Sequence, residues 1–176
     1  MKITGGHLRG RTWPVPVGRG VRPTASRVRE ALFSVLGQDL SGWTVLDAFG
    51  GSGLLGVEAH SRSASSVQIM EQNAKAASHI QKAIRALELP VQVRRGDVRT
   101  ILKTGRFDLV LMDPPYSNEP LPWIELGADA ALRVLVIETG AHHPLPERVR
   151  GLVRDRMRRY GDTQLGIYWR TLEGDE

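Results

Sequence analysis

The sequence predicts an α/β fold in which a mostly parallel sheet of seven strands ends in an antiparallel hairpin. From residue 43 onward, short apolar runs alternate with stretches of helical periodicity, which is typical of βαβ units whose sheet is buried on both faces. Two later runs flank Gly161-Asp162 and indicate a hairpin. The clearest helix has Ala77, Ile80, Ile84 and Leu87 on one side. The runs predicted as parallel strands are Thr44 to Leu46, Val67 to Met70, Val91 to Val93, Phe107 to Met112 and Val134 to Ile137.

An N-terminal extension precedes these elements. A glycine pair and an extended stretch over Leu8 to Val15 predict a β-hairpin within the first 16 residues. A helix is expected next, between Thr24 as its N-cap and Gly37, because apolar residues recur at helical spacing: Val28, Leu32, Val35 and Leu36. We therefore divide the chain into an extension over residues 1–37 and a main domain over residues 38–176.

Composition excludes several classes of protein. The 176 residues include no cysteine, which excludes disulfide frameworks, thiolate zinc sites and cysteine nucleophiles. The five histidines show no spacing typical of metal ligands, so no metal site is predicted. No apolar run approaches the roughly 18 residues that a membrane helix needs, and the first residues lack the apolar stretch of a signal peptide. We therefore expect a soluble, cytoplasmic protein without a membrane partner.

Charge is distributed unevenly along the chain. The formal net charge is +5, but residues 1–30 hold seven bases and one acid, and residues 148–159 hold six arginines and one aspartate. The rest of the chain carries a charge of −6. Two basic segments on an acidic body suit a polyanion partner such as a nucleic acid. The alternative is a solvated surface in a chain that prefers arginine, since it has 20 Arg and 4 Lys.

A glycine turn follows the first strand, in Val45-Leu46-Asp47-Ala48-Phe49-Gly50-Gly51-Ser52-Gly53. Glycines at such a position let the backbone approach a ligand closely. Gly51, Gly53 and Gly56 also satisfy G-x-G-x-x-G, the dinucleotide pattern, although tight packing produces the same match. Asp47 precedes the turn, where its carboxylate would repel a pyrophosphate but attract a cationic sulfonium. This favours S-adenosylmethionine over NAD.

Two further carboxylates follow the second and third strands. Glu71 closes the second strand and is placed to accept hydrogen bonds from both hydroxyls of a ribose, which NAD and S-adenosylmethionine share. Asp97, in Gly96-Asp97-Val98, is placed to accept from an adenine amine. An acidic helix start would also explain Glu71, and an ordinary turn would explain Asp97. Because such sites end successive strands, we expect them on one edge of the sheet, holding a nucleoside cofactor.

The fourth strand ends in Leu111-Met112-Asp113-Pro114-Pro115-Tyr116. Prolines stiffen the backbone and have no N–H group that competes for the carbonyls. Asp113 and the Pro114 carbonyl can then act as paired acceptors for a planar NH₂ group, while Tyr116 offers a face for stacking, worth about 1–3 kcal/mol per base. Two acceptors would orient the amine nitrogen toward a methyl donor and raise its electron density. The segment predicts methyl transfer to an exocyclic amine; a strand-ending turn is the plain alternative.

These four segments resemble motifs I to IV of the amino-group methyltransferases. The whole chain is similar to the bacterial 16S rRNA guanine-N2 methyltransferases, more specifically to the family that modifies guanine 966 of the small-subunit RNA. At the N-terminus the likeness is carried by Gly5-Gly6, Arg9-Gly10-Arg11, Arg22-Pro23-Thr24 and Arg27-Val28-Arg29-Glu30. It continues in Phe49-x-Gly51-Ser52-Gly53, Glu58-Ala59, Ser61-Arg62, Tyr160-Gly161-Asp162-Thr163 and Ile167-Tyr168.

The resemblance implies a Rossmann-like class I methyltransferase that transfers a methyl group from S-adenosylmethionine to guanine N2 of 16S rRNA in an assembling 30S subunit. We also expect a monomer without a metal ion. The catalytic residues would be Asp113, Pro114, Pro115 and Tyr116. The cofactor would contact Asp47, Phe49, Gly51, Ser52, Gly53, Glu71, Asp97 and Val98. The RNA would contact Arg9, Arg11, Arg22, Arg27 and Arg29, although pairing with Glu30 is an alternative for one or two of these arginines.

Three other functions remain open. The acceptor pair recognises an amino group rather than guanine, so adenine N6 or glutamine N5 is a compatible target. The glycine pattern alone also fits an NAD-dependent oxidoreductase. The basic segments alone also fit a ribosome-assembly factor that binds RNA without catalysis. The arginines of residues 148–159 have no assigned role.

Overall fold

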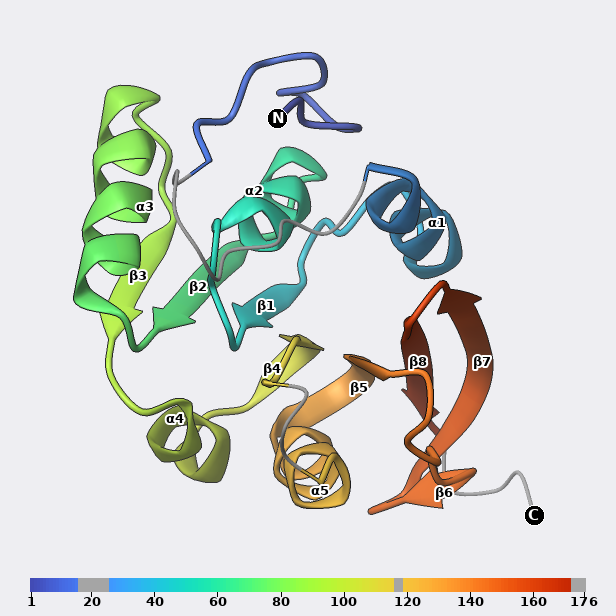
Figure 1. Ribbon diagram of the computed structural model, residues 1–176. Coiled ribbons are helices and arrows are strands. Elements are labelled where there is room, and N and C mark those ends of the chain that lie inside the picture. Colours follow the sequence, from blue (N-terminus) through green and yellow to red (C-terminus); the bar gives the residue numbers. More distant parts are fainter. Residues whose placement is uncertain (16–25, 116–118, 172–176) are drawn as a thin grey trace. The chain divides into compact units, whose positions relative to one another are not determined.

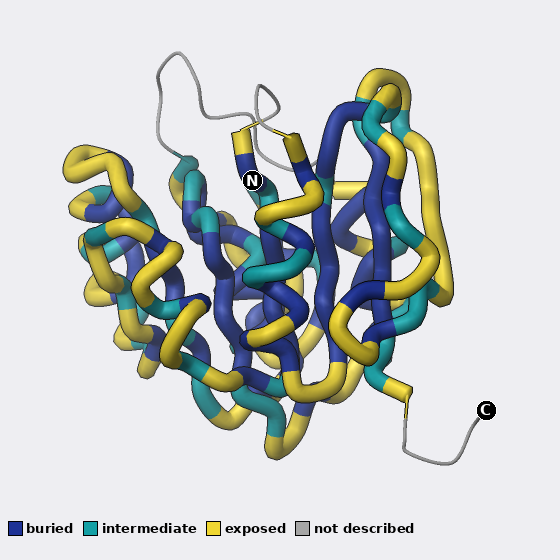
Figure 2. The backbone as a smooth tube through the Cα atoms, turned by 90° about the horizontal axis from the view of Figure 1, so that it is seen from below, coloured by how far each residue is buried: buried dark blue, intermediate teal, exposed yellow. Residues whose placement is uncertain are grey.

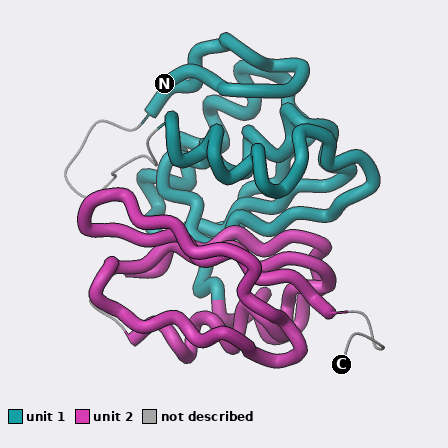
Figure 3. Tube along the Cα trace, turned by 90° about the vertical axis from the view of Figure 1, so that its right-hand side faces the viewer, with its two compact units in different colours: residues 1–98 teal, residues 99–176 magenta. Residues whose placement is uncertain are grey.

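The computed structural model describes residues 1–15, 26–115 and 119–171 (Figure 1). Over these ranges the chain forms five helices and eight strands. It divides into two compact units, Met1–Val98 and Arg99–Glu176, which Figure 3 colours separately. Strands and helices alternate through most of both units, as the sequence predicts.

The first unit contains three parallel strands in the order β3-β2-β1. They are β1 (Thr44–Asp47), β2 (Ser66–Glu71) and β3 (Gln92–Arg95). In the pairing register Asp47 lies opposite Ile69, and Glu71 lies opposite Arg95. The carboxyl ends of these strands therefore meet at one edge, where the sequence predicts the cofactor contacts.

Three helices belong to this unit: α1 (Ser26–Leu36), α2 (Leu54–Ser61) and α3 (Ala74–Ala86). Helix α2 packs on β1 and β2, and α3 packs on β2 and β3 (Figure 1). Asn73 caps α3, because its side chain accepts hydrogen bonds from the first backbone N–H groups of the helix. The predicted apolar face of α3 is buried, with Ala77, Ile80 and Ile84.

The N-terminal segment is less regular than the predicted β-hairpin. Its two arms meet in a single antiparallel bridge between Lys2 and Thr12, and bends and turns occupy much of the stretch between them. Backbone N–H groups of three intervening residues donate instead to Glu58 and Ser61 of α2. Because these donors are used by α2, the two arms do not continue pairing as strands. Thr24, the expected N-cap of α1, lies outside the described residues.

The second unit has five strands in the order β4-β5-β8-β7-β6. They are β4 (Phe107–Met112), β5 (Ala131–Gly140), β6 (Arg148–Val149), β7 (Leu152–Tyr160) and β8 (Thr163–Arg170). Strands β4 and β5 are parallel, and the other pairs are antiparallel. Strands β7 and β8 form the predicted hairpin, in which Gly161 has a φ of 62° as a two-residue turn requires. The short β6 is an additional strand that no apolar run predicts.

Two helices accompany these strands. Helix α4 (Val98–Thr104) begins at the last residue of the first unit, and α5 (Leu121–Ala130) packs on β4 and β5. Buried residues follow the strands in both units (Figure 2). Strands β3 and β7 are different, since β3 has no buried residue and residues 155–159 of β7 are exposed. In the described ranges, no helix has the length and apolar character needed to cross a membrane.

Candidate functional site

A tight turn joins β1 to α2 and contains the glycines that the sequence analysis singles out. Gly51 and Gly53 have φ values of 53° and 73°, a region that favours glycine. The backbone N–H of Gly53 donates to the carbonyl oxygen of Gly50 over 2.6 Å. A Cβ atom on Gly53 would lie 2.8 Å from Ile80 Cγ2, so any side chain there would collide with α3. Glycine is therefore needed both for the turn and for its close packing.

Asp47 ends β1 and holds the start of α2. Its side chain is buried, and Oδ2 accepts a hydrogen bond from the backbone N–H of Gly56 over 3.0 Å. A Cβ atom on Gly56 would lie 2.7 Å from Ile69 Cγ1. Close packing of α2 on β2 therefore requires glycine at position 56. This packing explains the match to G-x-G-x-x-G without a bound dinucleotide. Contact between Asp47 and the methionine part of a cofactor stays a prediction.

Glu71 joins the three segments that are predicted to hold a nucleoside. Its Oε2 accepts from the backbone N–H of Gly51 over 2.7 Å, and its Oε1 accepts from that of Asn73 over 2.6 Å. Its carbonyl oxygen accepts from the N–H of Gly96 over 3.3 Å, next to Asp97. The glycine turn and the ends of β2 and β3 therefore converge on Glu71. Each carboxylate oxygen has two lone pairs, so Glu71 keeps the capacity to accept from hydroxyl groups.

The remaining predicted cofactor residues differ in exposure. Phe49 is half-buried and Asp97 is exposed, so both side chains are accessible to a ligand. Ser52 and Val98 are buried. For these two residues, the peptide groups rather than the side chains are the expected contacts.

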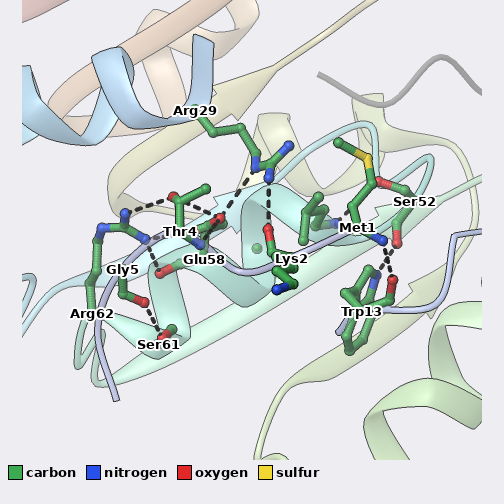
Figure 4. A network of polar contacts seen from close by, with 12 residues as sticks. Met1, Lys2, Thr4, Gly5, Trp13, Arg29, Ser52, Glu58, Ser61 and Arg62 are labelled. Carbon is green, nitrogen blue, oxygen red and sulfur yellow. Dashed lines mark hydrogen bonds and ion pairs between the residues drawn. The ribbon is translucent and has the colours of Figure 1, made fainter. Parts of the chain in front are cut away.

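Trp13 connects the N-terminal segment to the glycine turn, a role that the sequence analysis misses. Its side chain is fully buried, and Nε1 donates to the carbonyl oxygen of Ser52 over 2.7 Å (Figure 4). The terminal amino group of Met1 donates to the Trp13 carbonyl oxygen over 2.7 Å, which fixes the backbone on the other side. A lone tryptophan in an irregular segment has no periodic signal, so no sequence pattern could have identified this contact.

A buried ionic network holds the N-terminal segment and α1 on α2 (Figure 4). The fully buried Glu58 pairs with Arg29 over 3.2 Å and with Arg62. Its carboxylate also accepts from the backbone N–H and the hydroxyl of Thr4. Arg29 Nη2 in turn donates to the carbonyl oxygen of Lys2 over 2.9 Å. Because these partners satisfy the buried charges, the desolvation cost of burying them is offset.

This network corrects the prediction for Arg29. A guanidinium without exposed area cannot reach a phosphate, and the carboxylate that pairs with Arg29 is Glu58 rather than the neighbouring Glu30. Arg29 is therefore a structural residue. The other predicted RNA contacts in the described ranges, Arg9, Arg11 and Arg27, are exposed, and Arg22 lies outside those ranges.

In the second unit, Asp113 follows the carboxyl end of β4. Met112 pairs with Ile137 of the parallel strand β5, so Asp113 comes next to the position of Glu138. Burial raises the pKa of Asp113 to about 7, and the like charge of Glu138 acts in the same direction. A carboxyl group with this pKa changes its charge near neutral pH. It can therefore accept a hydrogen bond from an amine and take up a proton.

The structure describes the Asp-Pro-Pro-Tyr segment only as far as Pro115. Pro114 is buried and Pro115 is exposed. Neither residue has an N–H group, so neither backbone nitrogen can donate to a nearby acceptor. Tyr116, the predicted stacking surface, lies outside the described residues. Among the residues that are described, no three His, Asp or Glu side chains are grouped to hold a metal ion.

Comparison with known proteins gives the family. Residues 1–169 match the family described as Conserved hypothetical protein 95. The chain belongs to this family. Ribosomal RNA small subunit methyltransferase D of Escherichia coli K12 is 30% identical to it, over 99% of this chain and 92% of that protein. The Bacillus subtilis protein YlbH is 32% identical, over 96% of this chain and 98% of YlbH. The family resemblance found in the sequence is confirmed.

Solved structures confirm the fold class. The Escherichia coli protein yhhF matches with a TM-score of 0.83 at 29% identity, covering 98% of this chain and 99% of that chain. The structure of SMU.776 complexed with SAH matches with a TM-score of 0.66 at 14% identity, covering 81% of this chain and 48% of that chain. This member of the family therefore has the predicted Rossmann-like class I methyltransferase fold.

Proposed function

We propose that this protein transfers a methyl group from S-adenosylmethionine to the N2 amino group of a guanine in 16S rRNA, at the site equivalent to guanine 966. Methylation of rRNA is supported by a relative that covers nearly the whole chain and is named a small-subunit rRNA methyltransferase. Within this chain, the observation that carries the proposal is Asp113, a carboxyl group with a pKa of about 7 that lies between a parallel strand and two prolines. The choice of guanine rests on the resemblance of the sequence.

The first unit fits a nucleoside cofactor that carries a cationic sulfonium. Glu71 is anchored by Gly51 and keeps acceptor capacity for the ribose hydroxyls, and Asp97 is accessible to an adenine amine. The carboxylates of Asp47 and Glu71 on either side of the turn disfavour a pyrophosphate. When it is bound, S-adenosylmethionine supplies an electrophilic methyl group. We expect Glu71 and Asp97 to hold its nucleoside, and Asp47 with residues 51–53 to face its methionine part.

The acceptor groups of the second unit act on the target base. We expect the guanine to turn out of its stack onto Tyr116, which takes a few kcal/mol of unstacking energy. Its amino group then donates one hydrogen bond to Asp113 and one to the Pro114 carbonyl oxygen. These bonds orient the nitrogen and increase its electron density. The new N–C bond would form as the bond between the methyl carbon and the sulfonium sulfur breaks, with its electron pair staying on sulfur, and the amine then releases a proton to Asp113 or to water.

The N-terminal extension, residues 1–37, is the proposed RNA-binding region. Arg9, Arg11 and Arg27 are exposed on it, and with Arg22 they would contact phosphates of the substrate. The buried contacts of Arg29 and Trp13 hold this region in place. We propose that the protein acts in the cytoplasm as a monomer, on rRNA within an assembling 30S subunit.

The proposal is tested by methyl incorporation into small ribosomal subunits that lack the modification. Asp113→Asn keeps the side-chain shape but cannot take up a proton, so the rate is expected to fall by about 100-fold or more. Asp129→Asn, at an exposed position of α5, is the matched control and should retain full activity. Unchanged methylation by Asp113→Asn would remove the proposed acceptor. Calorimetric binding of NAD but not of S-adenosylhomocysteine would favour the oxidoreductase instead.

A further inference from the structure

Strand β7 presents arginine side chains that the proposed reaction does not use. Residues 155–159 of this strand are exposed, and three of them are arginines: Arg156, Arg158 and Arg159. The preceding Arg154 is half-buried and donates hydrogen bonds to two backbone carbonyl groups, so it serves the fold. The three exposed arginines are named here the β7 arginines.

The β7 arginines lie on a strand with one open edge. Strand β6 pairs only with the first two residues of β7, and no other strand in the described ranges covers that side. Side chains alternate along a strand, so Arg156 and Arg158 lie on one face of the hairpin, about 6–7 Å apart. Arg159 lies on the opposite face. Long side chains in this arrangement can reach successive phosphates of one nucleic-acid strand.

The β7 arginines are available to a partner. The backbones of Arg158 and Arg159 pair with β8, but their side chains make no hydrogen bond or ion pair within the described part of the chain. Arg156 pairs with the adjacent Asp155 over 3.2 Å, but both side chains are half-exposed. An exposed ion pair of this kind contributes about 0–1 kcal/mol, so a phosphate can replace the aspartate.

Protection of a strand edge explains these residues only in part. Charges of either sign prevent edge-to-edge pairing, so that role needs no excess of arginine. It also gives no reason for Met157, an apolar side chain that is 44% exposed and that shares its face of the strand with Arg159. A basic strand with an accessible apolar side chain fits a ligand that has both phosphates and apolar surface.

We propose that the open edge of β7, with the β7 arginines and Met157 distributed over its two faces, is a second RNA-binding surface that contacts the rRNA substrate outside the target guanine. The identity of the RNA rests on the proposed function. Guanidinium groups bind phosphates bidentately, and Met157 adds apolar area that a ribose or base can cover. This surface gives the second basic segment of the sequence a role separate from the N-terminal arginines.

The test is the salt dependence of binding to small ribosomal subunits and to single-stranded oligouridylate. The logarithm of the binding constant falls with the logarithm of the salt concentration, and each lost phosphate contact makes this slope shallower by about 0.7–0.9. The R156Q/R158Q/R159Q variant should therefore have a slope that is shallower by about 2. The matched control K82Q/R85Q/K103Q removes three exposed bases from other elements and should keep the slope. R156K/R158K/R159K retains the charges and should restore most of the slope.

Thermal unfolding and calorimetry with S-adenosylhomocysteine check that the glutamine variant is folded and still binds the cofactor. An unchanged slope for this variant, with a wild type that binds and methylates rRNA, would overturn the second surface and leave the proposed function intact. An equal loss of slope in the control variant would also overturn it. A wild type that neither binds RNA nor methylates rRNA would overturn both.

Discussion

The indole N–H of Trp13 donates a 2.7 Å hydrogen bond to the carbonyl oxygen of Ser52, inside the turn between β1 and α2. This bond attaches the segment proposed to bind RNA to the turn proposed to face the cofactor. The segment is packed into the first compact unit, because Glu58 of α2 also bonds Thr4 and Arg29. A substitution at Trp13 should therefore change the affinity for the cofactor.

Trp13→Phe keeps the aromatic packing but removes the donor to Ser52. An unsatisfied buried carbonyl costs about 1–3 kcal/mol, and the turn loses a support. We expect a lower free energy of unfolding in urea and several-fold weaker binding of S-adenosylhomocysteine by calorimetry. Trp43→Phe, at the opposite end of β1, is the control and should leave the cofactor affinity unchanged. If Trp13→Phe and the wild type bound S-adenosylhomocysteine equally well, the bond from Trp13 to Ser52 would have no role in cofactor binding.

Glu71→Gln should weaken cofactor binding more than it weakens the fold. The amide has one acceptor oxygen, so it cannot serve both Gly51 and Asn73 and still accept from a ribose. We expect S-adenosylhomocysteine to bind about tenfold or more weakly, since hydrogen bonds to a charged group contribute about 1.5–3 kcal/mol. Glu30→Gln changes an exposed carboxylate of α1 and should have no effect. If Glu71→Gln bound S-adenosylhomocysteine as tightly as the wild type does, the proposed contact between Glu71 and the ribose would be wrong.

The methylation rate should rise with pH through the pKa of Asp113, which burial and Glu138 raise to about 7. The ionised carboxylate is the better acceptor for the amine, so activity is lost as pH falls below this value. Glu138→Gln removes the like charge, which lowers the pKa of Asp113 and moves the midpoint of the profile to lower pH. Single-turnover rates between pH 5 and 9 measure both midpoints. A wild-type profile that is flat over this range would contradict the role of the Asp113 charge.

Glu58→Gln should strongly destabilise the protein. It leaves the buried guanidinium groups of Arg29 and Arg62 without a counter-charge, and breaking a buried pair in this way costs about 3–5 kcal/mol. Urea unfolding measures this loss. Arg27→Gln, two residues before Arg29 on α1 but at an exposed position, should keep the stability and weaken RNA binding instead. A stability loss as large for Arg27→Gln as for Glu58→Gln would contradict the separation of structural and RNA-binding arginines.

The fold could largely be predicted from the sequence because its signals are local. Apolar runs, the period of α3 and the turn at Gly161 each depend on neighbouring residues, and all of them agree with the structure. The N-terminal hairpin is shorter than predicted because the backbone N–H groups of Thr4, His7 and Leu8 donate to residues of α2 instead of to the opposite arm. Strand β6 has only two residues, too few for a periodic signal.

The sequence predicts the site residues whose position depends only on where a strand ends. Glu71 is the last residue of β2 and Asp113 follows β4, so the apolar runs that predict these strands also locate both carboxylates. The expectation that Arg29 contacts RNA is wrong, because charge alone does not reveal that Arg29 is buried and pairs with Glu58, 29 residues along the chain. The approach of Glu138 to Asp113 depends on the register of β4 and β5, which no sequence pattern sets.

The most direct test of the central claim is to identify the methylated nucleoside. Small ribosomal subunits that lack the modification are incubated with the purified protein and S-adenosylmethionine, and the rRNA is then digested, analysed by mass spectrometry and mapped. The proposed function predicts N2-methylguanosine at position 966 of 16S rRNA. N6-methyladenosine, methylation of protein glutamine, or rRNA that stays unmodified while the protein binds the cofactor would contradict it.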